Sequence, residues 1–425
     1  MARADKTRQA AVALVEGVID EGRMLSELVA GEGPLAALSP AERARAQRLA
    51  LSVLRHVEPV DRILQEYLRK PPPGTALHVL RLAAVEMLVE GTPPHAAVSS
   101  AVEILRAGRR TAALAGLANA VLRKVAEAGD AFAKLPPQRL PRWLRQPLVH
   151  LWGREVVAAI EAVQAGVPPL DLTLRAGEDP AGWAARLEAE VLPTGSLRRA
   201  AGGQVSALEG YEAGAWWVQD AAAALPARML APQPGERVLD LCAAPGGKTL
   251  QLAAAGARVT ALDVSPHRIE RVRENLARTG LAADVVVADA LDWETADPFD
   301  AILLDAPCSA TGTIRRHPDL PFVKDGTELA GLVDLQSRLI DRAVAMLKPG
   351  GRLVFCTCSI LPEEGEGQLA AALARHPGLG VEDTLSPGVP EGWRAPGGGI
   401  RTRPDHWAET GGIDGFFMAV LRLSA

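Results

Sequence analysis

The hydrophobic pattern of this chain changes its period near Glu236, and this change constrains the fold more than any other feature. Between Lys6 and about Lys134, apolar residues recur at helical spacing, as in AVALVEGVIDEG and ALHVLRLAAVEMLVE. From Glu236 onward, short apolar runs such as RVLDLC and FDAILLDAP alternate with helical segments such as PHRIERVRENLARTG. Alternating strands and helices form a parallel sheet that is covered by helices on both faces. The sequence therefore predicts a multidomain protein, with an all-α helical bundle followed by an α/β domain of the Rossmann-like type.

Two boundaries divide the chain into three predicted domains. The stretch LPPQRLPRWLRQPL, rich in Pro and Arg, ends the helical bundle and is typical of a linker. Residues 139–230 mix a possible strand, LDLTLRA, with short helical segments, so we expect a small α+β subdomain there. The predicted division is the bundle over residues 1–138, the subdomain over 139–230 and the α/β domain over 231–425. A final strand, GFFMAVLRL, is expected to close an edge of the sheet, antiparallel to a strand near Ile400–Arg403.

The first strand of the α/β domain ends in the loop DLCAAPGGKT, which leads directly into a helix. Gly246 and Gly247 allow a tight turn and a close approach of a ligand to the backbone. Their spacing matches neither the dinucleotide motif nor the phosphate-binding P-loop, so both classes are disfavoured. Asp263 and Asp289 end the second and third strands, where a carboxylate can accept ribose hydroxyls or contact an adenine edge. A helix cap is the alternative role for such an acid, but Ser265 is the better cap, and the strand-end acids together predict a nucleoside cofactor.

Two cysteines follow neighbouring strands of this predicted sheet. Cys308 lies in DAPCSATG after the fourth strand and Cys358 in FCTCS at the end of the fifth, with Asp305 beside them. Function concentrates at such strand ends, whereas Cys356 should face a helix because side chains alternate along a strand, and Cys242 should contribute its backbone to the cofactor loop. Carbon 5 of a pyrimidine becomes nucleophilic when a thiolate adds to carbon 6, and an acid beside N3 stabilises the developing charge. Two thiols and one carboxylate therefore predict covalent catalysis on a pyrimidine, with a second thiol assisting release.

The number and spacing of the cysteines, the hydropathy and the charge disfavour several other classes of protein. Four cysteines in 425 residues make a poor disulfide framework, and their spacing does not match a zinc site, so no metal is expected. No apolar stretch approaches about 18 residues, and the N-terminus lacks the pattern of a secretory signal, so we expect a cytoplasmic protein without membrane contact. The net charge of −5 conceals a basic part, because residues 1–140 hold 19 Lys and Arg against 15 Asp and Glu. An oligomer is not indicated, and a monomer is the default expectation.

A compact cationic segment, TIRRHPDL, follows the fourth strand. Arg315, Arg316 and His317 are suited to contact RNA phosphates if this loop lies near the target base. A solvated loop with ordinary surface salt bridges explains the charge equally well.

The motifs of the α/β domain resemble those of the RNA (cytosine-5) methyltransferases of the Sun/Nop2-like family. The matching segments, in that family's order, are DLCAAPGGKT, DVSPHRIERVRENLARTG, DAPCSATGTIRRHPD, CTCSILPEE and the terminal DGFF, over roughly residues 210–425. The helical segments HAAVSSAVEILRAG and LANAVLRKV are also similar to the antitermination factor NusB. A NusB-like domain joined to such a catalytic domain is the arrangement of bacterial enzymes that methylate 16S rRNA. The resemblance therefore implies an S-adenosylmethionine-dependent enzyme that has this RNA as its partner.

The same resemblance implies a role for each site residue. Cys358 would attack carbon 6 of a cytosine, Cys308 would assist release, and Asp305 would contact the target base and the cofactor region. S-adenosylmethionine would be bound by Cys242, Ala243, Ala244, Pro245, Gly246, Gly247, Lys248, Asp263, Asp289 and Asp305.

Three alternatives differ from this interpretation in substrate or in class. A cytosine-5 methyltransferase could act on another RNA, such as tRNA. A DNA methyltransferase would use the Pro-Cys cysteine, Cys308, as its nucleophile and would lack the Thr-Cys pair, so the presence of both motifs disfavours it. A non-catalytic RNA-binding assembly factor would not need Cys358, Cys308, Asp305 and the glycine loop together. Methyl transfer from S-adenosylmethionine would separate an enzyme from this last alternative.

Overall fold

The computed structural model describes residues 5–30, 33–200, 202–383 and 385–425, so residues 1–4 of the predicted helical domain lie outside it. The chain divides into two compact units, Met1–Gly166 with Ile314–Asp325, and Val167–Thr313 with Gly326–Ala425. The stretch Ile314–Asp325 thus interrupts the α/β sequence and belongs to the helical unit. Its residues Phe322 and Val323 pack against the helical core, which accounts for this assignment.

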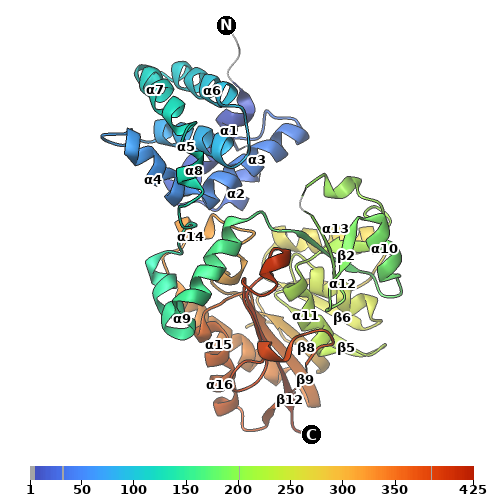
Figure 1. Ribbon diagram of the computed structural model, residues 1–425. Coiled ribbons are helices and arrows are strands. Elements are labelled where there is room, and N and C mark those ends of the chain that lie inside the picture. The colour runs from blue at the N-terminus through green and yellow to red at the C-terminus, as the bar shows by residue number, and fades with distance from the viewer. Residues whose placement is uncertain (1–4, 31–32, 201, 384) are drawn as a thin grey trace. The chain divides into compact units, whose positions relative to one another are not determined.

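Every regular element that the structure describes in the first unit is helical (Figure 1). One continuous cluster of buried Ala, Val, Leu and Ile side chains from α1 to α7 forms the core, which confirms the helical bundle. Ser39 caps α3 in a capping box with Glu42, which places the start of this helix at Pro40. The helices are α1 (Lys6–Ile19), α2 (Leu25–Val29), α3 (Pro40–Arg55), α4 (Val57–Tyr67), α5 (Thr75–Leu88), α6 (Pro94–Ala107), η1 (Ala112–Leu114), α7 (Ala115–Val125), α8 (Gly129–Phe132), α9 (Arg142–Ala165) and α14 (Leu320–Val323).

A small antiparallel sheet opens the second unit. Its strands are β1 (Leu170–Leu174), β2 (Ala189–Val191), β3 (Leu197–Arg199) and β4 (Trp216–Val218), in the order β2-β3-β1-β4. Helix α10 (Pro180–Arg186) packs beside this sheet through the buried side chains of Trp183 and Ala184. The predicted α+β character of this part of the chain is confirmed.

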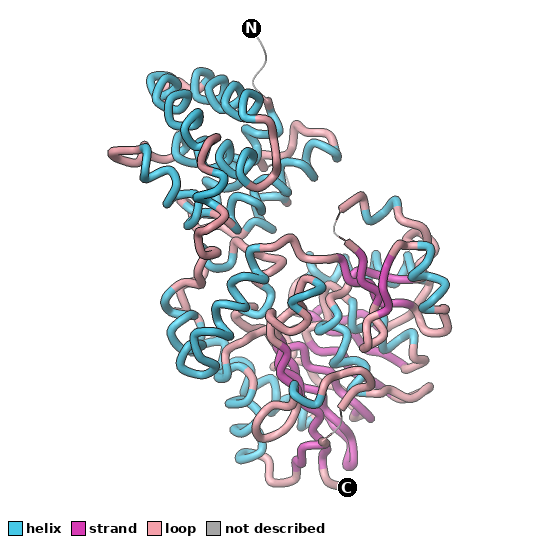
Figure 2. Tube along the Cα trace, viewed as in Figure 1, coloured by secondary structure: helices cyan, strands magenta, loops and turns pink. Residues whose placement is uncertain are grey.

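Strands of the second unit are magenta in Figure 2. The larger sheet has the order β10-β12-β9-β8-β5-β6-β7, with β11 paired to β12. Strands β5 (Arg237–Leu241), β6 (Arg258–Asp263), β7 (Asp284–Val287), β8 (Phe299–Asp305) and β9 (Leu347–Thr357) are parallel, as predicted. Strand β12 (Phe416–Leu423) is antiparallel to β11 (Ile400–Thr402), but its prediction as an edge strand is wrong. It lies between β9 and β10 (Leu379–Glu382), and its run of apolar residues is buried because neighbours cover both sides.

Helices cover both faces of this sheet because side chains alternate along its strands. On β8, Ile302 and Leu304 share a core with α15 (Leu329–Ala345) and α16 (Glu366–Arg375). Ala301 and Leu303 of the same strand share a core with α11 (Ala221–Leu230) on the other face. Helices α12 (Gly247–Ala254) and α13 (Pro266–Thr279) follow β5 and β6 and pack beside them. The result is the doubly wound, Rossmann-like arrangement that the sequence predicts.

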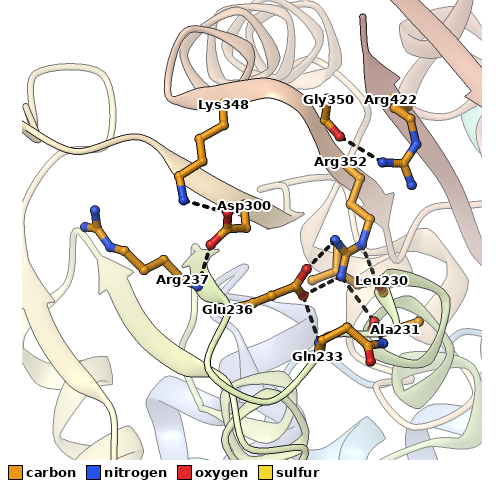
Figure 3. A network of polar contacts seen from close by, with 10 residues as sticks. All are labelled: Leu230, Ala231, Gln233, Glu236, Arg237, Asp300, Lys348, Gly350, Arg352 and Arg422. Carbon is orange, nitrogen blue, oxygen red and sulfur yellow. Dashed lines mark hydrogen bonds and ion pairs between the residues drawn. The ribbon is translucent and has the colours of Figure 1, made fainter. Parts of the chain in front are cut away.

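Ion pairs and hydrogen bonds connect neighbouring strands at the amino-terminal edge of the parallel sheet, as Figure 3 shows. Arg352 of β9 donates to both carboxylate oxygens of Glu236 at 3.0 and 2.7 Å. Asp300 accepts from the Arg237 backbone at 2.9 Å and from Lys348 Nζ at 2.6 Å. These contacts join the starts of β5 and β8 to β9 and leave the opposite edge, where ligands bind in open α/β sheets, for the site.

The predicted boundaries at residues 138 and 230 stay predictions about independently folding domains. Helix α9, which follows residue 138, belongs to the first unit, whereas β1–β4 share the second unit with the larger sheet.

Candidate active site

The switch point of the large sheet lies between the neighbouring strands β5 and β8. The loop from β5 to α12 contains two residues with a positive φ, Cys242 at +62° and Gly246 at +102°. A side chain at Gly246 would lie 3.3 Å from Val272 of α13, so both the backbone conformation and the available space favour glycine. The backbone N–H groups at the start of α12 follow directly, at the carboxyl-terminal edge of the sheet.

Asp263 is held firmly at the end of β6. Its side chain is 2% exposed and accepts bonds from the backbone N–H groups of Ala244 at 3.1 Å and Ser265 at 3.0 Å. Ser265, as predicted, is the residue that caps α13. Asp289 follows β7, is exposed and accepts one bond from the Leu291 backbone at 2.9 Å. The carboxylate of Asp263 therefore belongs to the same rigid loop system as the β5–α12 turn.

Lys248 pairs with Asp305 rather than standing alone in the cofactor loop. Its Nζ lies 2.6 Å from Asp305 Oδ2, and the lysine is 8% exposed. Burial lowers the pKa of Lys248, but the charge and hydrogen bond of Asp305, together with other nearby acidic groups such as Asp240, raise that pKa overall. The ammonium group is therefore held charged beside the carboxylate at the end of β8.

Asp240, the last residue but one of β5, was not among the predicted site residues although it lies in the same motif. It is fully buried, and its Oδ2 accepts a bond from Thr249 Oγ1 at 2.6 Å. Its Oδ1 is buried without a hydrogen-bond partner in the described part of the chain. Burial raises the pKa of Asp240 to about 7, so this acid can hold a proton near neutral pH.

The two predicted thiols meet at the ends of β8 and β9. Cys308 Sγ lies 3.4 Å from Cys358 Sγ, and both residues are half-buried. Contact with Cys358 and burial raise the pKa of Cys308 well above its usual value. Cys356 is fully buried, and burial raises its pKa, as burial also does for Cys242. Cys356 packs in the core that contains α11, as predicted, but alternation along β9 is not the reason, because residues two apart share a face and Cys358 packs against the same core. Cys356 Sγ donates to Asp305 Oδ1 at 3.5 Å, so this thiol also lies beside the site.

The start of β12 supports the loop that carries Cys308. Gly312 donates its N–H to the Cys358 carbonyl at 3.0 Å, and Gly415 donates to the Gly312 carbonyl at 2.8 Å. A Cβ on Gly312 would lie 1.8 Å from the Gly415 oxygen, so a side chain cannot be accommodated without moving the loop. The terminal DGFF motif therefore acts in the structure as a backbone support for the thiol pair.

Arg315, Arg316 and His317 lie in Ile314–Asp325, which belongs to the first unit, whereas both thiols belong to the second. Arg315 is 1% exposed, and its carbonyl accepts a bond from Arg55 Nη2 at 3.2 Å. Arg316 is half-buried and His317 is exposed. The contact of these three residues with RNA stays a prediction, and His317 is the member most open to solvent.

Within the described residues, no three His, Cys, Asp or Glu side chains lie together in a way that could hold a metal ion. Within the same residues, no helix has the length and apolar character needed to cross a membrane.

Two family models match the chain. Residues 227–422 match the model described as 16S rRNA methyltransferase RsmB/F, and residues 5–127 match the NusB family. A protein of Cronobacter sakazakii named ribosomal RNA small subunit methyltransferase B is 37% identical over 444 residues, covering 99% of both chains.

Solved structures are similar in fold. A methyltransferase homolog protein from Pyrococcus horikoshii is 27% identical, with a TM-score of 0.55 over 65% of this chain and 93% of its own. The structure of NSun6 from Pyrococcus horikoshii, solved with SFG, is 20% identical, with a TM-score of 0.59 over 67% of this chain and 98% of its own.

Proposed function

Because the chain belongs to the RsmB/F family of 16S rRNA methyltransferases, we propose that it methylates carbon 5 of a cytosine in that RNA through covalent attack by Cys358. The chain is an S-adenosylmethionine-dependent RNA methyltransferase, with rRNA as the substrate of its family. The observation that carries the finer proposal is the pair of thiols, 3.4 Å apart, at the ends of neighbouring parallel strands.

The residues at the switch point fit S-adenosylmethionine. A closely packed glycine turn, a helix start and a fixed strand-end carboxylate form a set of donors and acceptors suited to a nucleoside. In this proposal Asp263 accepts hydrogen bonds from the ribose hydroxyls and Asp289 contacts the adenine edge. The backbone of Cys242–Lys248 contacts the rest of the S-adenosylmethionine molecule. The cofactor, when bound, supplies an electrophilic methyl group.

The thiol pair and the Lys248–Asp305 pair account for the proposed chemistry. Cys358 forms a bond to carbon 6 of the cytosine, and the electron pair of the 5,6 double bond then makes carbon 5 the nucleophile. Asp305, oriented by Lys248, contacts N3, and in its protonated form it donates to N3 and neutralises the negative charge that develops there. The carbon 5 proton and the Cys358 sulfur then leave to restore the 5,6 double bond. We assign Cys308 to this step: its thiol gives a proton to the departing Cys358 sulfur, 3.4 Å away, and the resulting thiolate accepts the carbon 5 proton. The raised pKa of Cys308 disfavours its thiolate and so favours Cys358 as the nucleophile.

The test is methyl transfer from isotopically labelled S-adenosylmethionine to purified 16S rRNA, followed by nucleoside mass spectrometry. We expect 5-methylcytosine in the small-subunit rRNA and none in a tRNA control. Label found in tRNA alone would show that tRNA, and not 16S rRNA, is the substrate. A product other than 5-methylcytosine would overturn the proposed chemistry. Absence of transfer to every RNA would favour the non-catalytic assembly factor.

Replacement of Asp263 by asparagine is expected to weaken S-adenosylmethionine binding by about 10- to 100-fold, since hydrogen bonds to a charged group are worth about 1.5–3 kcal/mol. The amide keeps the shape of the side chain but removes the charge and one acceptor. Isothermal titration with the cofactor measures the change. Asp284→Asn is the matched control, because Asp284 is an exposed aspartate at the start of the neighbouring β7. Equal affinities for the two variants would contradict the ribose assignment.

A further inference from the structure

Glu364 is a fully buried acid whose side chain is hydrogen-bonded to Ser309, the residue after Cys308. It ends η4 (Pro362–Glu364), the short turn after the Cys358 loop, and it is 0% exposed. Its Oε1 accepts bonds from the Ser309 backbone at 2.8 Å and from Gln336 Nε2 at 3.0 Å, and its Oε2 accepts from Ser309 Oγ at 2.5 Å. All three donors are neutral groups. Burial of a carboxylate costs free energy of folding unless its oxygens are hydrogen-bonded in this way. These bonds therefore show that the surrounding residues are arranged to accommodate Glu364.

Ser309 follows Cys308 directly in the chain, so the bonds to Glu364 fix the backbone that carries the Cys308 thiol. Gln336 of α15 braces the same loop, because its Nε2 also donates to the Pro307 carbonyl at 2.8 Å. Gln368 of α16 donates in turn to Gln336 Oε1 at 3.2 Å. The two residues that flank Cys308 are therefore both tied to one network.

The network also reaches the Cys358 loop. Ser359 Oγ lies 3.2 Å from Ser309 Oγ and 3.1 Å from Thr311 Oγ1, and Thr357 Oγ1 donates to the Glu364 carbonyl at 2.9 Å. Residues on either side of Cys358 thus share partners with the residue after Cys308. Buried hydrogen bonds, and not packing alone, therefore fix the loop that carries Cys308 relative to the loop that carries Cys358.

We propose that Glu364 is a positioning residue that holds the Cys308 thiol against Cys358, so that Cys308 can act in release. The effect on release rests on the proposed function, whereas the effect on the geometry of the two thiols does not. The negative charge of Glu364 acts in the same direction as contact with Cys358 and burial, which together keep the proton on Cys308 by raising its pKa.

Two substitutions separate the bonds from the charge. In Glu364→Gln the amide oxygen can accept from Ser309 N and Gln336, while the amide N–H₂ donates to the Ser309 hydroxyl, which can accept as well as donate. Glu364→Ala removes every bond of the side chain and leaves the Ser309 N–H unpaired in the interior. Glu363→Ala is the matched control, because Glu363 lies in the same turn and is exposed.

The first measurement needs no RNA. Diamide takes two hydrogens from two neighbouring thiols and leaves a disulfide, and mass spectrometry of the linked peptides measures how fast Cys308 joins Cys358. In the full-length protein, we expect Glu364→Ala to slow this closure about tenfold, because misplaced groups lose most of their effective concentration. Glu364→Gln and Glu363→Ala should stay within about twofold of the unmodified protein.

The second measurement follows methyl transfer and the covalent protein–RNA adduct on a denaturing gel. Glu364→Ala is expected to accumulate adduct and to lower turnover about tenfold with an unchanged KM for S-adenosylmethionine, and Glu364→Gln is expected to restore turnover. A general loss of folding would instead reduce adduct and product together. If Glu364→Ala does not fold, Ser309→Ala, which removes only the hydroxyl bond, takes its place, and we expect closure about threefold slower.

Unchanged disulfide closure in a folded Glu364→Ala or Ser309→Ala protein would overturn the proposal. Failure of Glu364→Gln to restore either readout would overturn it as well, since the bonds would then not be the cause. If the unmodified protein produces no 5-methylcytosine, the proposed function fails, but the closure rates still decide whether Glu364 positions the thiols.

Discussion

Replacement of Cys358 by alanine is expected to reduce methyl transfer to cytosine on the order of 10⁴-fold or more, the scale seen when a covalent nucleophile is removed. Without the bond between sulfur and carbon 6, carbon 5 is not nucleophilic enough to take the methyl group. We do not expect Cys308 to replace it, because burial still raises the pKa of Cys308 after the contact with Cys358 is lost. Single-turnover transfer from labelled cofactor to 16S rRNA measures the loss, and no covalent protein–RNA adduct should form.

Cys356→Ala is the control for this variant. Cys356 lies two residues earlier on β9, is fully buried and makes one weak bond, from its Sγ to Asp305 Oδ1 at 3.5 Å, so its loss should leave transfer within about tenfold. S-adenosylmethionine binding should be unchanged in Cys358→Ala, which shows that the loss concerns chemistry rather than folding. Transfer by Cys358→Ala at the rate of the unmodified protein would remove Cys358 from the mechanism.

The positions of the site residues were predictable where a simple rule of sheet topology applies. A doubly wound sheet brings the ends of its fourth and fifth strands together, so the approach of Cys308 to Cys358 followed from the strand pattern alone. Alternation along a strand did not separate Cys356 from Cys358, because residues two apart share a face, and both cysteines contact the same core. What distinguishes Cys356 is its complete burial in that core. The glycine turn and Asp263 followed from the same rule, because each ends or follows a strand of the parallel sheet.

Features that depend on segments far apart in sequence were not predictable in this way. Glu364 gains its importance from bonds to Ser309 and Gln336, which lie 55 and 28 residues away, and no local pattern announces them. The membership of Ile314–Asp325 in the helical unit was not predictable for the same reason, because it depends on packing against helices that are distant in sequence. Strand β12 was assigned to an edge because its partner β10 is a short segment with a weak strand signal.

Replacement of Cys308 by serine is expected to trap a protein–RNA adduct that survives denaturation. Cys358 can still attack carbon 6 and the methyl group can still be transferred, but the step that removes the carbon 5 proton and releases Cys358 loses its partner. Multiple turnover should fall by about 10²-fold or more, the range of general acid–base catalysis, while a single methyl transfer is retained. Labelled RNA that migrates with the protein on a denaturing gel measures the adduct.

The double variant Cys308→Ser with Cys358→Ala decides which sulfur holds the RNA. We expect the adduct to disappear, because the bond to carbon 6 is assigned to Cys358 alone. An adduct that requires Cys308 and survives the loss of Cys358 would reverse the two roles and restore the scheme in which the Pro-Cys cysteine attacks. The 3.4 Å separation of the sulfur atoms makes this test necessary, because both thiols lie close enough to reach the same carbon. Only their protonation and their supporting bonds distinguish them, and the division of labour proposed here depends on that difference.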